Sequence, residues 1–171
     1  MSEHITQLDQ LWPEKVNFDF LILQDDDPNC LAVYRGENSD GRTFTVYRTD
    51  QGNANPEKRC DFLLVDQEMT HAWYIELKGK NHWDNACRQL LRTHRQFSPQ
   101  LGIPDSNAFF RLVSSSTRSG MRVFRSYTSY RHLIMSLPSS RQFKVMFSSL
   151  DGIHKDYEVL EDATIIPFDE E

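Results

Sequence analysis

The sequence predicts a single α/β domain, residues 1–171, in which a central mixed β-sheet is flanked by helices. Its length is that of one ordinary domain, and 39% of its residues are hydrophobic, enough for a sizeable core. Segments with a strand-like period of two precede and follow one long segment with helical spacing. Strands, a helix and further strands in this order indicate helices packed on a mixed sheet.

Seven segments are predicted as strands because their apolar residues alternate or form short runs bounded by turn residues: 30–35, 43–48, 60–65, 72–78, 108–115, 142–150 and 156–162. The first two flank the turn "GENSDG" and the next two flank "DQEMTH". We therefore expect each of these two pairs to form a hairpin.

Three segments are predicted as helices. Residues 3–12 form a short one, and 129–137 form a late one. Between them, residues 82–97 place apolar side chains at helical spacing, with Asn81 as the start signal and Pro99 as the stop. This central helix would connect two strands of the sheet.

The charge is unevenly distributed along the chain, although the net charge is −6. Residues 78–146 contain twelve Lys or Arg and only two acidic residues, whereas the C-terminal segment 151–171 is acidic. A basic surface of this kind is suited to a polyanion such as nucleic acid. Alternatively, the basic residues face acidic ones within the fold, or the acidic C-terminal segment covers them or binds a partner.

The sequence also indicates where in the cell the protein is expected. No run approaches the roughly 18 apolar residues of a membrane span, and the polar N-terminus lacks the features of a signal peptide. The three cysteines are odd in number, widely spaced and without a zinc-ligand pattern. We expect a cytoplasmic protein with reduced core thiols and no membrane partner.

Glu76 and Lys78 lie on one face of an otherwise apolar strand. If "DQEMTH" is the connection, Val65 pairs with Ala72, and the same register places Asp61 opposite Glu76, with Cβ atoms about 4.5–5.5 Å apart. Two carboxylates there repel each other unless a cation lies between them, and Mg²⁺ prefers such oxygen ligands. A slip of one residue would separate the pair.

These motifs resemble those of a known group. "CDFLLV", then "YIELKGK", then a helix carrying "RQLLRT" look like the PD-(D/E)XK, or restriction-endonuclease-like, nuclease superfamily, over a core of about residues 30–115. The resemblance implies that Asp61 and Glu76 bind Mg²⁺, for which Mn²⁺ can substitute. It also implies that Lys78 positions or activates the attacking water.

The chain departs from the superfamily pattern in places. Gln89 matches a Gln found on the following helix, but Thr93 stands where some branches have Tyr, and Cys60 precedes the Asp where Pro is common. The acidic residue that many members carry on the first helix has three candidates here: Glu3, Glu14 and Glu37.

Several residues are candidates for nucleic-acid binding. Arg88, Arg92 and Arg95 share a helical stripe that is suited to phosphates, although such a stripe is about as often a solvated face. Lys80 follows on the active face of the strand. Gln89 could contact a base, but a hydrogen-bonding role within the helix is the simpler interpretation.

Two functions follow as hypotheses. The first is a Mg²⁺-dependent nuclease that hydrolyses DNA, and less readily RNA, by in-line attack of water; by analogy it would belong to a mobile-element, phage or host-defence system. The alternative is a catalytically silent nuclease-like module that binds nucleic acid or protein as a regulatory subunit. A homodimer, or a protein bound through the acidic C-terminal segment, is the further partner expected.

Overall fold

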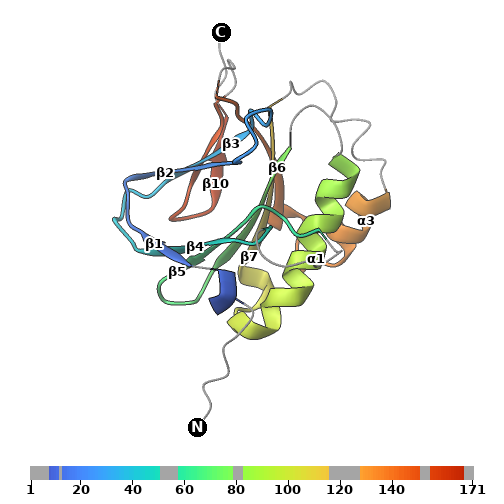
Figure 1. Cartoon of the computed structure of the whole chain (residues 1–171). Helices are drawn as coiled ribbons and strands as arrows, with labels where there is room; N and C mark the ends of the chain where they lie inside the picture. Colours follow the sequence, from blue (N-terminus) through green and yellow to red (C-terminus); the bar gives the residue numbers. More distant parts are fainter. Residues whose placement is uncertain are drawn as a thin grey trace.

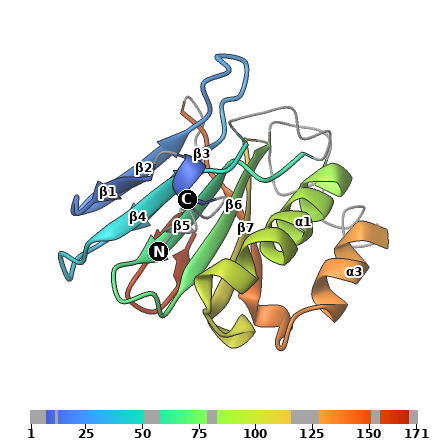
Figure 2. The same ribbon diagram turned by 60° about the horizontal axis from the view of Figure 1, so that its bottom comes forward.

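The chain folds into three layers, in which two β-sheets pack face to face and α-helices cover the outer face of the larger sheet (Figure 1 and Figure 2). The computed structural model describes residues 8–11, 13–50, 58–78, 83–115, 128–150 and 155–167. The predicted α/β class is confirmed. The predicted mixed sheet with helices packed on it is present, but the helices cover only one of its faces and a second sheet covers the other.

The larger sheet contains, in order across it, β1 (Glu14–Val16), β4 (Phe44–Arg48), β5 (Phe62–Asp66), β6 (Ala72–Lys78), β7 (Ala108–Ser114) and β8 (Phe143–Phe147). Neighbouring strands from β1 to β6 are antiparallel, whereas β6, β7 and β8 run parallel. A parallel connection requires a crossover. Helix α1 (Trp83–Leu101) provides it between β6 and β7.

The smaller sheet contains, in order, β10 (Thr164–Ile166), β9 (Tyr157–Val159), β3 (Val33–Glu37) and β2 (Phe20–Gln24). Its inner face packs on the side of the larger sheet that carries Trp73, Ile75 and Leu77 of β6. These three side chains are almost fully buried. The apolar face of β6 therefore forms the core between the two sheets.

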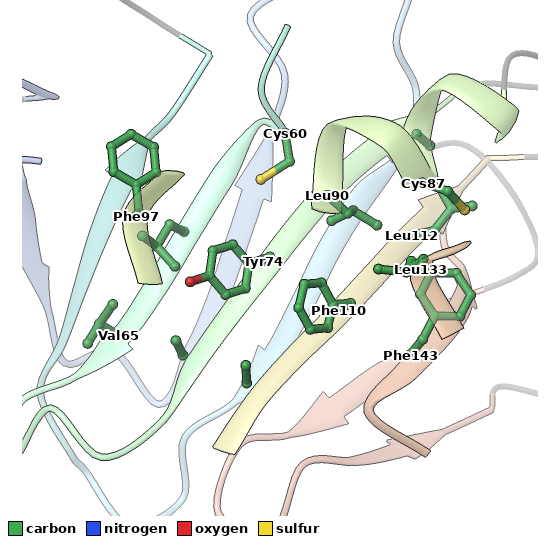
Figure 3. Packing of buried hydrophobic residues seen from close by; sticks show 14 of the residues in the cluster. Cys60, Val65, Tyr74, Cys87, Leu90, Phe97, Phe110, Leu112, Leu133 and Phe143 are labelled. Atoms are coloured by element: carbon green, nitrogen blue, oxygen red, sulfur yellow. The ribbon is translucent and has the colours of Figure 1, made fainter. Parts of the chain in front are cut away.

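The other face of β6 packs beneath the helices. Tyr74 stacks on Phe110 of β7 at a centroid distance of 5.1 Å, and Leu90 of α1 lies above them (Figure 3). Helix α3 (Thr128–Met135) lies beside α1 and buries Leu133 in the same core. Short 3₁₀ turns occur at Asp9–Leu11, Asp105–Asn107 and Ser140–Gln142.

A buried ion pair joins the two sheets. Arg111 of β7 donates from Nε and Nη2 to one carboxylate oxygen of Glu158 in β9, at 3.0 and 2.7 Å. Tyr34 of β3 donates to the other oxygen at 2.6 Å, and all three residues are fully buried. Arg111, which belongs to the basic segment 78–146, is thus paired with an acidic residue inside the fold. This pairing agrees with the alternative interpretation, in which basic residues face acidic ones within the protein.

The predicted hairpin of residues 30–35 and 43–48 is wrong. Strand β3 pairs with β2 and β9, while β4 pairs with β1 and β5 in the other sheet. The connection between them passes from one sheet to the other and is held by Asn38, whose side-chain nitrogen donates to the carbonyls of Arg42 and Phe18. Periodicity shows which side chains share a face, but it does not show which strand is the partner.

The predicted end of the central helix is also wrong, because α1 continues past Pro99 to Leu101. Near the C-terminus Pro99 removes a single backbone N–H, and burial of Leu101 offsets that loss. The helix stops at Gly102, which has a φ of 66° and donates to the Ser98 carbonyl at 3.2 Å. This is the left-handed glycine that commonly terminates helices.

Other predictions fall partly outside the described residues. Of the predicted helix 3–12, residues 9–11 form a 3₁₀ turn, and residues 3–7 and 12 lie outside the description, as does the start signal Asn81. The three cysteines are free thiols: Cys60 and Cys87 are buried, whereas Cys30 is only partly so.

Candidate functional site

The β5–β6 hairpin has the predicted register. Val65 pairs with Ala72, and the pairing continues to Phe62 opposite Ile75. Asp61 immediately precedes β5, so the same register places it across from Glu76. The period-two pattern and the length of the connection were sufficient to predict this part of the fold.

Asp61 is held against β6 by the main chain. Its carboxylate oxygen Oδ2 accepts a hydrogen bond from the backbone N–H of Leu77 at 2.7 Å, and its carbonyl accepts from Thr49 N–H at 3.1 Å. Leu77 lies between Glu76 and Lys78 in the sequence. The structure therefore brings the Asp61 carboxylate to the segment of β6 that carries the other two predicted catalytic residues.

Glu76 and Lys78 contact each other on the α1 side of the sheet. The Lys78 Nζ lies 2.9 Å from Glu76 Oε1. Glu76 is only 1% exposed, and its second oxygen, Oε2, is buried and has no hydrogen-bond partner within the part of the chain that the structure describes. The side chain of Lys78 is 21% exposed, so this end of the site reaches solvent.

The carboxylates are electrostatically coupled. Burial raises the pKa of Asp61 to about 7, although the hydrogen bond from Leu77 lowers it; the carboxylates of Asp50 and Asp25 raise it further. Burial, followed by the charge of Asp61, raises the pKa of Glu76 well above its ordinary value, while Lys78 acts in the opposite direction. Burial and mutual repulsion therefore oppose simultaneous ionisation of both carboxylates near neutral pH, and Lys78 offsets only part of this effect.

The donor set fits a hard divalent cation. Carboxylate oxygens are the ligands that Mg²⁺ prefers, and the unpaired Oε2 of Glu76 is a buried acceptor in need of a positive partner. Within the described ranges, no group of three or more His, Cys, Asp or Glu side chains is arranged around a common point for a metal. Asp61 and Glu76 would thus supply two carboxylates, and Mg²⁺ characteristically retains several waters where a protein supplies so few ligands.

Helix α1 positions the strand segment that leads to Asp61. The hydroxyl of Thr93 accepts from Cys60 N–H at 2.8 Å and donates to the Gln89 carbonyl at 2.7 Å. Arg92 donates to the carbonyl of Lys58 at 3.2 Å. The role of Thr93 was missed from the sequence, where it appeared only as a departure from a motif.

Gln89 is a helix residue that faces the strands. Its side-chain nitrogen donates to the Arg59 carbonyl at 3.3 Å, and the residue is only 8% exposed. Its side-chain oxygen is buried and has no partner among the residues described. This arrangement matches the interpretation of Gln89 as a hydrogen-bonding helix residue. In this position it anchors the segment before Asp61.

The basic candidates occupy different positions. Arg88 is exposed and pairs with Asp84 at 2.8 Å, and Arg95 is exposed one turn beyond Arg92. Lys80 lies outside the described residues.

The candidates for a further acidic ligand lie on other strands. Glu14 is exposed on the edge strand β1, and Glu37 ends β3 in the smaller sheet. Neither has a described contact with Asp61 or Glu76, whereas Asp50 and Asp25 act on Asp61 electrostatically.

Comparison of the chain with models of protein families, with curated proteins and with solved structures finds no match. Among the helices in the described ranges, none has the length and apolar character needed to cross a membrane.

Proposed function

We propose that the chain is a divalent-metal-dependent nuclease that hydrolyses phosphodiester bonds of DNA. The observation that carries this proposal is the convergence of Asp61, Glu76 and Lys78 at one end of β5 and β6. It is the set of residue types expected from the resemblance to PD-(D/E)XK nucleases. The crossover helix α1, which follows β6 and packs on the same sheet, also agrees with that resemblance.

In this proposal Asp61 and Glu76 hold Mg²⁺, which when bound neutralises charge on the phosphate and makes a water nucleophilic. Lys78 supplies a second positive group where negative charge develops in the transition state. Its contact with Glu76 fixes the position of the ammonium at the exposed end of the site. The Leu77 N–H orients the Asp61 carboxylate, so the hairpin register itself arranges the reacting groups.

A second function is favoured by one specific observation. Lys78 already neutralises one oxygen of Glu76 without any metal, as it would in a nuclease-like module that binds nucleic acid or protein but does not cut. Such a module needs neither the Asp61 carboxylate nor the unpaired oxygen of Glu76. A cleavage assay therefore distinguishes the nuclease from the binding module.

The test is incubation of the protein with single-stranded, duplex and branched DNA and with RNA, in the presence of Mg²⁺. The wild type should cut at least one DNA substrate, and Lys78→Ala should be at least about 100-fold slower. Lys144→Ala, which changes a lysine of β8, is the matched control and should cut like the wild type. Equal cleavage by the wild type and Lys78→Ala would reveal a contaminant, and absence of cleavage from the whole panel would favour the binding module.

A further inference from the structure

Helices α1 and α3 lie side by side on the outer side of the larger sheet (Figure 2). Their side chains leave a groove between them. Its volume is about 690 Å³. Arg88, Arg92 and Arg95 line it from α1, and Thr128, Ser129 and His132 line it from α3. These residues come from parts of the sequence that are distant from each other, and the groove exists only in the folded chain.

The groove is positively charged. Among the described residues that line it, none is acidic. The carboxylate of Asp84, beside the groove, is already engaged: one oxygen lies 2.8 Å from Arg88 Nη2, and the other accepts from the hydroxyl of Ser129. In this described part of the chain, arginine side chains therefore dominate the charge of the groove.

The arrangement of donors matches a run of phosphates. Along α1 the distance from Arg88 to Arg95 is about 10 Å, at a rise of about 1.5 Å per residue. Phosphates recur about every 3.4 Å per strand along a duplex axis and lie farther apart in an extended single strand, so two or three consecutive phosphates of one strand fit this span. On the opposite wall, Thr128 and His132 add donors, and the N-terminal end of α3 favours negative charge.

The groove and the candidate site share helix α1. Thr93 and Gln89 face the strand segment before Asp61, whereas Arg88 and Arg95 face the groove. Arg92 belongs to both, because it lines the groove and donates to the carbonyl of Lys58, three residues before Asp61. A strand held in the groove would therefore lie against the element that positions the carboxylates.

We propose that the α1–α3 groove binds two or three consecutive phosphates of a single nucleic-acid strand. The volume is that of a site for one ligand of modest size, which suits the backbone of one strand rather than a duplex. The identification of this strand as the substrate rests on the proposed nuclease function. The binding of phosphates by the groove does not.

The test is fluorescence anisotropy with a labelled oligothymidylate of about 12 nucleotides, in EDTA so that no cleavage occurs, over a series of salt concentrations. For single strands the slope of log K against log salt is about −0.7 per phosphate contact. The double variant Arg88→Gln/Arg95→Gln should weaken binding at least 10-fold and make the slope about 1.4 less steep. Arg92 is left unchanged because it also holds the strand segment.

Arg131→Gln is the matched control, because this arginine is exposed on α3 but does not line the groove. It should change binding less than about twofold. Absence of binding by the wild type, an unchanged slope in the double variant, or an equal loss in Arg131→Gln would each overturn the inference. Equal competition by a duplex of the same length, or by thymidine monophosphate at matched phosphate concentration, would overturn the assignment to a single strand.

The two proposals fail in different ways. A wild type that binds the oligonucleotide through the groove but never cuts contradicts the nuclease function and leaves the groove assignment intact. A wild type that cuts, beside a folded double variant that binds and cuts equally well, contradicts the groove assignment alone. Circular dichroism of both variants establishes that they are folded.

Discussion

The ammonium of Lys78 lies 2.9 Å from Oε1 of Glu76, two residues earlier on the same strand, while the other Glu76 oxygen is buried without a hydrogen-bond partner among the described residues. The two oxygens of this carboxylate thus differ in their contacts. In the proposed nuclease, the lysine would orient the carboxylate and the second oxygen would bind the cation.

Lys78→Met should therefore separate metal binding from chemistry. It removes the ammonium but keeps both carboxylates, so Mn²⁺ should still raise the melting temperature, while cleavage should fall about 10²–10³-fold. Glu76→Gln should lose both the metal-dependent rise and cleavage. Differential scanning fluorimetry with a parallel cleavage assay checks this, and loss of the metal response in Lys78→Met would contradict the division of roles.

The raised pKa of Asp61 predicts opposite effects of pH on the metal-free and the metal-loaded protein. Burial raises this pKa to about 7, so the associated stability is present at low pH and is lost as the pH rises through about 7. A cation favours the ionised form, so the stabilisation by Mn²⁺ should grow over the same range. Melting temperatures measured between about pH 5 and pH 8 provide the check.

In that series, Asp61→Asn should make the metal-free protein less sensitive to pH and should remove the response to Mn²⁺. Asp40→Asn, which changes an exposed carboxylate, should behave like the wild type. A metal response that shrinks as the pH rises would contradict the coupling between proton and metal.

The turn between β5 and β6 depends on Asp66. Burial raises the pKa of this carboxyl, but hydrogen bonds from Thr70 and His71 outweigh burial and lower it overall. A lowered pKa gives stability that is present above the unfolded value and is lost as the pH falls through the folded value. Asp66→Asn should cost about 1–3 kcal/mol near pH 7, and the difference should narrow below about pH 4.

Urea unfolding of the wild type and Asp66→Asn, near pH 7 and again below about pH 4, measures this difference in the free energy of unfolding. Glu68→Gln is the control because Glu68 is exposed on the same turn. An Asp66→Asn penalty that is equal at both pH values would show that shape, and not the charge of the carboxylate, stabilises the turn.

The buried pair of Arg111 and Glu158 should be necessary for the attachment of the smaller sheet. Glu158→Ala removes the only carboxylate that is described in contact with the fully buried Arg111 guanidinium, and it removes the acceptor of the Tyr34 hydroxyl. Unfolding should therefore become easier by about 3–5 kcal/mol. Glu161→Ala, at an exposed position, should change stability by less than about 0.5 kcal/mol. Chemical denaturation checks both, and a Glu158→Ala penalty below about 1 kcal/mol would contradict this role.

The parts of the fold that were predictable are those fixed by local patterns. The β5–β6 register follows from alternating apolar residues and a six-residue connection, which left one way to bury Trp73, Ile75 and Leu77 together. The position of Asp61 across from Glu76 followed from that register. Helical spacing likewise predicted α1, because an apolar stripe can be read without knowing its partner.

The remainder depends on contacts that local patterns do not contain. The apolar pattern of β3 does not show its partners, and its pairing with β2 and with the distant β9, rather than with β4, places it in the second sheet. The roles of Thr93 and Arg111 depend on atoms supplied by Cys60 and Glu158, which are far away in the sequence. In the sequence, Gly102 marks the end of α1, because a glycine can adopt the left-handed conformation that follows a helix. Pro99 does not end the helix, because it lies in the last turn.

If Asp61 and Glu76 share a divalent cation, calorimetric titration of Mn²⁺ into the protein near pH 8 should detect it. Binding to the wild type should be saturable, and a folded Asp61→Asn variant should bind Mn²⁺ with at least 10-fold lower affinity. Equal affinity in the two proteins, or no binding by the wild type, would contradict the sharing of a cation.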